Sequence, residues 1–156
     1  MLTINLNTAI SKVFKIKKNR KIVVFTNGCF DLLHKGHLSY LKASKELGDY
    51  FIVGLNSDES VKKLKGKDRP IDNELIRARN LLSTSVVDDV IIFNEDNPRN
   101  LINSILPNVL TKGGDYSENE IIGADTVKSN GGSVEIIPLL EGYSTSKIIR
   151  DLDEKA

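Results

Sequence analysis

The segment FTNGCFDLLHKGH, from Phe25 to His37, joins an apolar stretch to a helix-like stretch. Its Asn-Gly pair is a turn signal, and it ends with His34 and His37, the only two histidines of the chain. A helix that begins near Lys35 would point its free backbone N–H groups and its positive dipole end toward both imidazoles. The segment therefore predicts a strand, a turn and a helix that form an anion site with two histidine donors, which suits phosphate chemistry.

Two other interpretations of the histidine pair are open. The two rings could simply pack on one turn of a helix, or they could ligate a metal ion. Gly36 between them disfavours a helix interior, where glycine is costly. A metal site would have to be completed by carboxylates, because there is no third histidine.

The composition indicates one globular domain with a real core. The chain has 156 residues, of which 40% are hydrophobic and 28% charged, and a formal net charge of +1. This balance predicts neither a nucleic-acid nor a membrane partner, and no apolar run approaches the ~20 residues of a membrane span. We expect residues 1–20 to form a helix or arm and residues 21–156 to form the domain.

The single cysteine, Cys29, excludes an internal disulfide and fits a reducing, cytoplasmic location. It could be a nucleophile beside the predicted phosphate loop, but a small buried thiol is the commoner role for such a residue.

Short apolar segments alternate with helical patterns along the chain. Continuous apolar strands indicate a sheet buried on both faces, and strand–helix repetition indicates a parallel sheet with right-handed crossovers. The strands are predicted at residues 21–25, 50–55, 86–93, 109–112 and 133–138. The helices are predicted at residues 38–47, 73–83, 97–105, within 117–130, and at 144–152.

Polar clusters follow four of these strands, at residues 26–37, 56–69, 112–116 and 143–146. The carboxyl ends of parallel strands meet at one edge, where such folds bind ligands. The clusters therefore predict one shared site. Dinucleotide oxidoreductases and P-loop ATPases are disfavoured, because the chain lacks both glycine-rich fingerprints.

A basic cluster surrounds Gly66 in what we expect to be a loop. It is either a solvated surface or a mobile lid whose cations offset phosphate charge. Arg77, on the following helix, is either an exposed arginine or a phosphate ligand. The cluster comprises Lys62, Lys63, Lys65, Lys67 and Arg69.

Two further segments have both a structural and a functional interpretation. The first, Lys112-Gly113-Gly114-Asp115-Tyr116, is either a plain turn or a close approach of backbone to ligand. The second, Ser144-Thr145-Ser146, precedes an apolar helix and suits an N-cap, a phosphate cradle, or both.

These motifs together resemble a known enzyme family. The His34-Lys35-Gly36-His37 motif resembles the H-x-G-H motif of cytidylyltransferase-like nucleotidyltransferases, and Ser144-Thr145-Ser146 resembles their second motif. The combination is similar to the adenylyltransferases that make ADP-heptose from D-glycero-β-D-manno-heptose 1-phosphate, in their stand-alone form. The more specific segments are residues 26–31, Asn56-Ser57-Asp58, Lys65-Gly66 with Arg69-Pro70, and residues 112–116.

The resemblance implies a Rossmann-like α/β fold, with five parallel strands in the order 3-2-1-4-5 and helices on both faces. It implies transfer of AMP from ATP to the heptose phosphate, with Mg²⁺ held mostly by substrate and water. It also implies a cytoplasmic homodimer that serves lipopolysaccharide or surface-glycan synthesis.

Alternatives are a cytidylyl- or adenylyltransferase for another acceptor, of the glycerol 3-phosphate or FMN type, and a non-catalytic nucleotide-binding module. The resemblance assigns catalysis to His34, His37, Lys65 and Arg77. It assigns binding of nucleotide or substrate to Thr26, Asn27, Gly28, Phe30, Asp31, Asn56, Asp58, Arg69, Lys112, Gly113, Gly114, Asp115, Ser144, Thr145 and Ser146.

Overall fold

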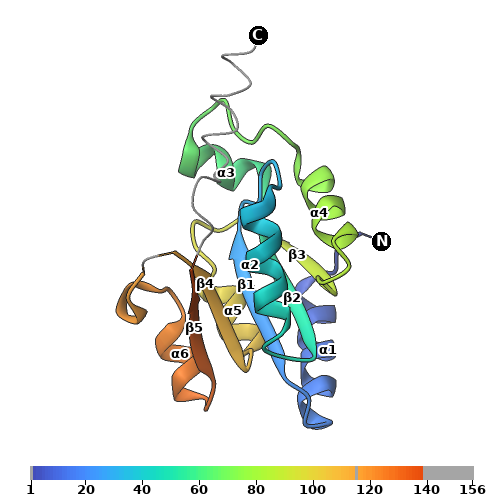
Figure 1. The fold of residues 1–156 in the computed structure, drawn as a ribbon, viewed down its shortest axis with the longest axis vertical. Coiled ribbons are helices and arrows are strands. Elements are labelled where there is room, and N and C mark those ends of the chain that lie inside the picture. Colours follow the sequence, from blue (N-terminus) through green and yellow to red (C-terminus); the bar gives the residue numbers. More distant parts are fainter. Residues whose placement is uncertain (1, 115, 139–156) are drawn as a thin grey trace.

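The computed structural model describes residues 2–114 and 116–138. Its five strands form one parallel sheet in the order β3-β2-β1-β4-β5, which confirms the predicted fold class and strand order (Figure 1). The strands are β1 (Val23–Gly28), β2 (Tyr50–Asn56), β3 (Asp89–Phe93), β4 (Val109–Gly113) and β5 (Ser133–Ile137).

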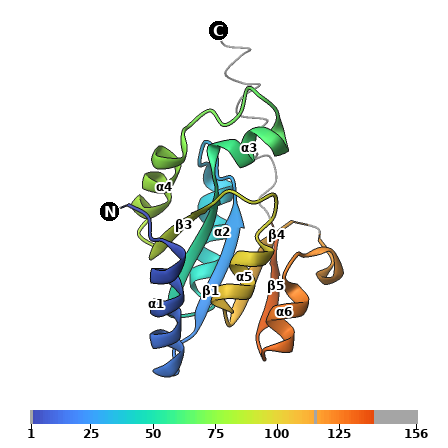
Figure 2. The same ribbon diagram turned by 180° about the vertical axis from the view of Figure 1, so that it is seen from behind.

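Helices cover both faces of the sheet, as Figures 1 and 2 show from opposite sides. The helices are α1 (Leu6–Lys18), α2 (Lys35–Lys45), α3 (Asp58–Lys65), α4 (Glu74–Ser83), α5 (Arg99–Ile105) and α6 (Ala124–Ser129), with a 3-10 turn η1 (Glu118–Glu120). None of the helices among the described residues has the length and apolar character needed to cross a bilayer.

The core has two halves, one on each face of the sheet. Consecutive residues of β1 supply both halves: Val23 and Phe25 pack with α1, α5 and α6, whereas Val24 packs with α2 and α4. All three side chains have no exposed surface. This two-sided burial is the reason that the strand is continuously apolar in sequence.

The first helix belongs to this core. Ala9 and Val13 of α1 are at most 2% exposed and lie in the same cluster as α5. The division of the chain at residue 20 stays a prediction.

The basic segment after β2 corrects one expectation. Residues 58–65 form helix α3, not a loop, so Lys62, Lys63 and Lys65 lie in the last turn of a helix. Ser57 caps its N-terminus by accepting a hydrogen bond from Ser60 N at 3.1 Å. Acidic residues in the first turn and basic residues in the last complement the helix dipole.

Other element boundaries differ by a few residues. β1 extends to Gly28, beyond the predicted end at Phe25, because β2 pairs with it along its whole length. The helix predicted at residues 144–152 lies outside the described residues.

Candidate active site

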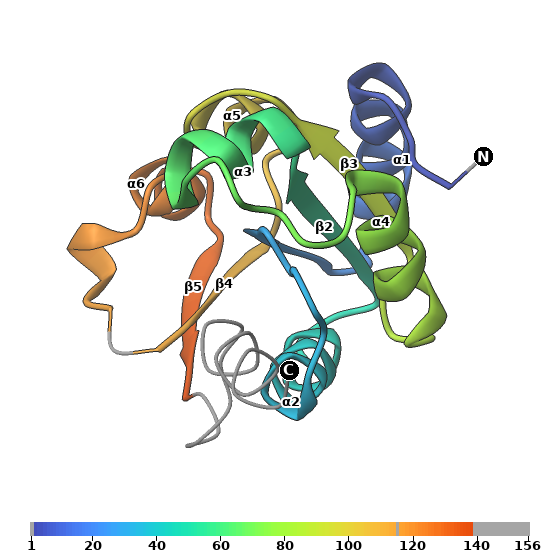
Figure 3. The ribbon, with the colours of Figure 1, turned by 90° about the horizontal axis from the view of Figure 1, so that it is seen from above.

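A cleft lies at the carboxyl ends of the neighbouring strands β1 and β4. The helices that follow these strands, α2 and α6, lie on opposite faces of the sheet (Figure 3). Such a switch point is where open α/β sheets bind ligands. The cleft has two connected parts. One, the histidine cavity, has a volume of about 310 Å³ and is lined by His37, Phe30, Asp31, Tyr40 and Gly113.

The other part, the polar cavity, has a volume of about 490 Å³. Five of its lining residues carry carboxylate or amide groups: Asn27, Asn56, Asp96, Asn97 and Glu120. The two cavities share six lining residues, so they form one continuous space. The shared residues are Asn27, Gly28, Cys29, Lys65, Lys112 and Tyr116.

Helix α2 begins at Lys35, where the sequence predicts a helix start, and the two histidines form its N-terminal cap. His34 is the N-cap residue, and its Nδ1 accepts hydrogen bonds from Gly36 N at 3.1 Å and His37 N at 3.4 Å. In return, His37 Nδ1 accepts from His34 N at 3.4 Å, which completes a capping box. The rings stack with their centroids 3.8 Å apart.

This capping geometry determines where each imidazole carries its proton. Because Nδ1 of both rings accepts a backbone hydrogen bond, the neutral rings carry their proton on Nε2. Each ring can therefore donate Nε2–H to an anion without a positive charge. Interpretation of the pair as packing alone is incomplete, because His37 also lines the cleft.

The surroundings keep His37 neutral. The pKa of His37 is lowered to about 4, mainly by burial and also by the nearby His34 and Lys65, against the opposing effect of Asp31. Burial also lowers the pKa of His34. Both histidines are therefore hydrogen-bond donors at neutral pH, not cations.

The loop between β1 and α2 has unusual backbone geometry. Phe30 and Leu32 adopt left-handed conformations with φ of 47° and 55°, a costly state for residues with a Cβ. The ring of Phe30 meets His37 edge to face, with centroids 5.5 Å apart. A Cβ on Gly28 would lie only 2.9 Å from Phe30 Cε2, so glycine lets this ring cover the strand end.

Two lysines line both parts of the cleft, Lys65 from α3 and Lys112 from β4. Lys112 Nζ lies 5.1 Å from the centre of the Tyr116 ring, within range of a cation–π interaction. Burial lowers the pKa of Lys112. Burial also raises the pKa of the Cys29 thiol, which disfavours the thiolate that a nucleophile needs.

Asp31 joins the loop after β1 to the connection between α3 and α4. Its carboxylate, 1% exposed, accepts hydrogen bonds from Ile71 N at 2.7 Å and Asp72 N at 3.0 Å. Arg69 Nε lies 3.4 Å from the same carboxylate. Asp31 and Arg69 thus hold one wall of the cleft in place.

Arg77 differs from its sequence interpretation. Its side chain has no exposed surface and does not line either cavity of the cleft. Its guanidinium donates to Asp58 Oδ1 at 2.8 Å and to three backbone carbonyls at 2.8–2.9 Å: those of Cys29, Asn56 and Asp72. The contacts of Arg77 support positioning of the surrounding loops, not direct contact with phosphate.

Three other predicted residues use their polar groups for hydrogen bonds within the protein. Thr26 is buried in the core, where its hydroxyl bonds to Tyr40. Asn56 lines the polar cavity, but its Nδ2 donates to Ser60 Oγ at 2.8 Å. Gly114, with φ of 103°, continues the sheet through its bond to Ile137 O. Asp115, Ser144, Thr145 and Ser146 lie outside the described residues.

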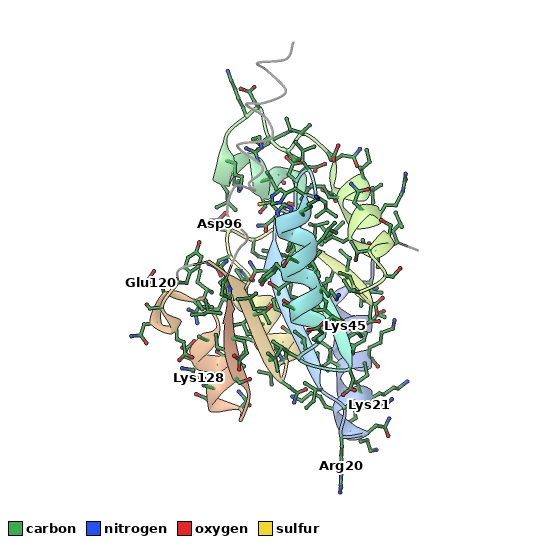
Figure 4. All side chains as sticks on the ribbon, viewed as in Figure 1. Arg20, Lys21, Lys45, Asp96, Glu120 and Lys128 are labelled. Atoms are coloured by element: carbon green, nitrogen blue, oxygen red, sulfur yellow. The ribbon has the colours of Figure 1, made fainter. Side chains whose placement is uncertain are left out.

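Sequence reasoning missed the role of Tyr40 and of the segment after β3. Asp96 and Asn97 follow β3, whose carboxyl end meets the same edge as β1, and this position was the available signal. Figure 4 shows Asp96 and Glu120 above Lys45 and Lys21. Among residues 2–114 and 116–138, no group of three or more His, Cys, Asp or Glu side chains could hold a metal ion.

The fold and the cleft define a Rossmann-like α/β protein with neutral histidine donors at a helix N-terminus. The chain belongs to the cytidylyltransferase-like family, whose pattern matches residues 25–151. The family resemblance predicted from the histidine motif is thereby confirmed.

Named relatives are longer than this chain. It is 48% identical over 147 residues to the bifunctional protein HldE of Syntrophotalea carbinolica, a match that covers 94% of this chain and 30% of HldE. It is 51% identical over 140 residues to HldE of Campylobacter jejuni, covering 90% of this chain and 30% of HldE. The chain therefore spans about 30% of the length of these curated relatives.

Solved structures share the fold. The lipopolysaccharide core biosynthesis protein of Thermoplasma volcanium is 32% identical, with a TM-score of 0.63 over 80% of this chain and 99% of that one. A pantoate-beta-alanine ligase of Francisella tularensis has a TM-score of 0.61 over 96% of this chain and 75% of that one. At 15% identity, the ligase indicates the fold alone.

Proposed function

We propose that this chain transfers AMP from ATP to D-glycero-β-D-manno-heptose 1-phosphate and releases pyrophosphate. The observation that carries the proposal is the capped histidine pair, of which His37 lines a cleft that two lysines also line. The similarity to HldE and to a lipopolysaccharide core biosynthesis protein favours a sugar phosphate as acceptor.

The reaction would proceed by direct in-line displacement. A phosphate oxygen of the heptose phosphate attacks the α-phosphorus of ATP, and the bond from that phosphorus to the bridging oxygen of pyrophosphate breaks. No covalent enzyme intermediate is needed, so catalysis consists of positioning and charge stabilisation. The raised pKa of the Cys29 thiol agrees with a mechanism that uses no cysteine nucleophile.

The histidine cavity suits the triphosphate. His34 and His37 would donate Nε2–H bonds to phosphate oxygens, where neutral donors avoid the cost of burying a further charge. Lys65 and Lys112 would offset the charge that builds on the α-phosphate and on pyrophosphate. Arg77 would act on the reaction only through the loops that it holds.

The polar cavity suits the sugar. Amide and carboxylate groups at its wall can bind several hydroxyl groups, and Asn27 and Lys65 lie where this cavity meets the histidine cavity. The acceptor phosphate would therefore approach the α-phosphate from this side. The predicted binding roles of Gly28, Phe30, Asp31 and Gly113 fit the wall of the histidine cavity.

Mg²⁺ would enter with the nucleotide. Phosphate oxygens and water would hold the ion, as is usual for Mg²⁺ bound with a nucleotide. Roles for Asp115 and for Ser144 to Ser146 remain predictions from sequence, as does a cytoplasmic homodimer.

Pyrophosphate release tests the proposal. With Mg²⁺ present, turnover should require both ATP and the heptose phosphate, and CTP or glycerol 3-phosphate should not replace them. Turnover with CTP or with glycerol 3-phosphate would reject the substrate assignment. ATP binding without turnover on any acceptor would reject the catalytic proposal.

A further inference from the structure

Four hydroxyl groups form a buried cluster around Tyr40, a residue that lines the histidine cavity. They belong to Thr26 of β1, Tyr40 and Ser44 of α2, and Thr111 of β4, and none of these residues is more than 6% exposed. The Tyr40 oxygen lies 2.6 Å from Thr26 Oγ1 and 3.0 Å from Thr111 Oγ1. Ser44 Oγ lies 2.9 Å from Thr111 Oγ1.

The direction of every bond in this cluster follows from counting protons. Thr26 donates to the backbone carbonyl of Thr111 at 3.1 Å, so Tyr40 must donate to Thr26. Tyr40 then has no proton left for Thr111, which must donate to Tyr40, and Ser44 must donate to Thr111. The chain runs from Ser44 through Thr111, Tyr40 and Thr26 to the Thr111 carbonyl, and each hydroxyl has one use for its single proton.

The members of the cluster adjoin residues of the cleft. Tyr40 follows His37 by one helical turn, Thr26 directly precedes Asn27, and Thr111 directly precedes Lys112. These three neighbours come from three separate elements and meet only in the tertiary structure. A shift of α2 along the sheet would break the hydroxyl chain and move His37 relative to Asn27 and Lys112.

We propose that Tyr40 is a positioning residue, which through the hydroxyl chain holds His37 on α2 in register with Asn27 on β1 and Lys112 on β4. As a statement about catalysis, this inference rests on the proposed function. Apolar side chains could fill the same volume with α2 in more than one position on the sheet. A buried chain of directed hydrogen bonds is satisfied in only one position of α2. Misplacement of a reacting group by about 1 Å can cost about 100-fold in rate.

The test compares two tyrosine-to-phenylalanine changes. Tyr40→Phe removes the hydroxyl that joins α2 to β1 and β4. Tyr50→Phe removes a hydroxyl that donates to Asp89 Oδ2 at 2.6 Å, at the opposite end of the sheet. We expect Tyr40→Phe to lower kcat about 10- to 100-fold with KM for ATP within about twofold. Tyr50→Phe should leave both constants unchanged, whatever its effect on Tm.

A second pair of variants keeps the test valid if Tyr40→Phe fails to fold. Thr111→Val has nearly the same shape as threonine but lacks the hydroxyl, and Thr111→Ser retains the hydroxyl. Thr111→Val should reproduce the loss of kcat, and Thr111→Ser should restore kcat to within about threefold of the original. Equal kcat values in both variants would overturn the proposal, as would unchanged kcat in Tyr40→Phe.

A readout independent of activity separates this inference from the proposed function. The chain has two histidines, so their ring nitrogens give a simple nitrogen–proton NMR spectrum, assigned with a His34→Gln variant. Tyr40→Phe should shift the His37 resonances, and Tyr50→Phe should not. If the unaltered protein turns over no acceptor, the proposed function fails, whereas unchanged His37 resonances in folded Tyr40→Phe overturn the positioning role.

Discussion

The two ends of the sheet differ in how their charged side chains are paired. At the amino ends of β2 and β3, Asp89 accepts hydrogen bonds from Lys12 and Tyr50, and Asp88 accepts from Lys45. At the carboxyl ends, Lys65 and Lys112 form no ion pair with any residue that the structure describes. Figure 4 shows Lys45 and Lys21 toward the amino end and Asp96 toward the carboxyl end.

This difference separates groups that stabilise the fold from groups available to a ligand. Charges that neutralise one another at the amino ends produce little net field, whereas lysines without acidic partners make the cleft attractive to phosphate. Arg77 is an exception at the carboxyl end, because its guanidinium is paired and buried beneath the cleft.

The largest expected effect is the loss of stability when Arg77, the paired and buried cation at the carboxyl end, is replaced. Arg77→Met should lower the free energy of unfolding by about 3–5 kcal/mol, because it leaves Asp58 and three carbonyls without their donor. The value should lie near the lower limit, since the Asp58 side chain is 34% exposed. Arg79→Met, on the exposed side of the same helix, should change stability by less than about 0.5 kcal/mol in urea unfolding. A similar loss of unfolding free energy in both variants would contradict the structural role of Arg77.

The next effect concerns catalysis at the carboxyl end. His37→Ala should lower kcat about 100- to 1,000-fold while KM for ATP changes only a few-fold, because a donor to developing charge acts mainly in the transition state. Steady-state pyrophosphate release measures both constants. An equal loss of ATP affinity and of kcat/KM, with kcat unchanged, would mean that His37 contributes only to ground-state binding.

The pH dependence of stability should also show the histidine pair. The pKa of His37 is lowered from 6.5 to about 4 in the fold, so only the unfolded chain binds a proton between these values. The stabilising effect of a neutral His37 is therefore complete above pH 6.5 and decreases as the pH falls toward about 4, by about 2–3 kcal/mol in total. The stability difference between the unaltered protein and His37→Gln should shrink by this amount from pH 7 to pH 4 in urea titrations. A constant difference would contradict the lowered pKa.

The smallest effect is expected at the amino end. Lys45→Met removes a partly exposed ion pair with Asp88 and should cost at most about 1 kcal/mol, less at high salt. kcat should be unchanged. Thermal unfolding at low and high salt, together with one activity measurement, would check both parts. A loss of kcat would contradict the separation of the two ends.

Much of the site could be predicted because the relevant signals are local. An Asn-Gly turn, a glycine between two histidines and an apolar strand are neighbours in sequence, and their backbone chemistry determines where the strand ends and the helix begins. The same segment did not predict the left-handed conformations of Phe30 and Leu32, of which Phe30 packs against His37 and the surrounding core.

The charged residues were harder to assign. Lys65 and Arg77 are both basic residues near the end of β2, and nothing in their local sequence distinguishes a lysine that faces the cleft from an arginine that lies in the core. The sequence predicts a loop around Gly66 that includes Lys62, Lys63 and Lys65, yet long charged side chains also favour helix formation, and Gly66 ends the helix.

The sequence by itself determined the alternation of strands and helices, the parallel sheet, the edge at which the site lies and the histidine cap, because apolar periodicity and capping act over a few residues. Only the tertiary structure decided which cations face the cleft, which are buried, and that four hydroxyls from three elements meet at Tyr40 and Thr111. Burial and hydrogen-bond partners depend on contacts between residues far apart in the chain, such as Thr26 with Thr111 and Arg77 with Cys29, and no local pattern records them.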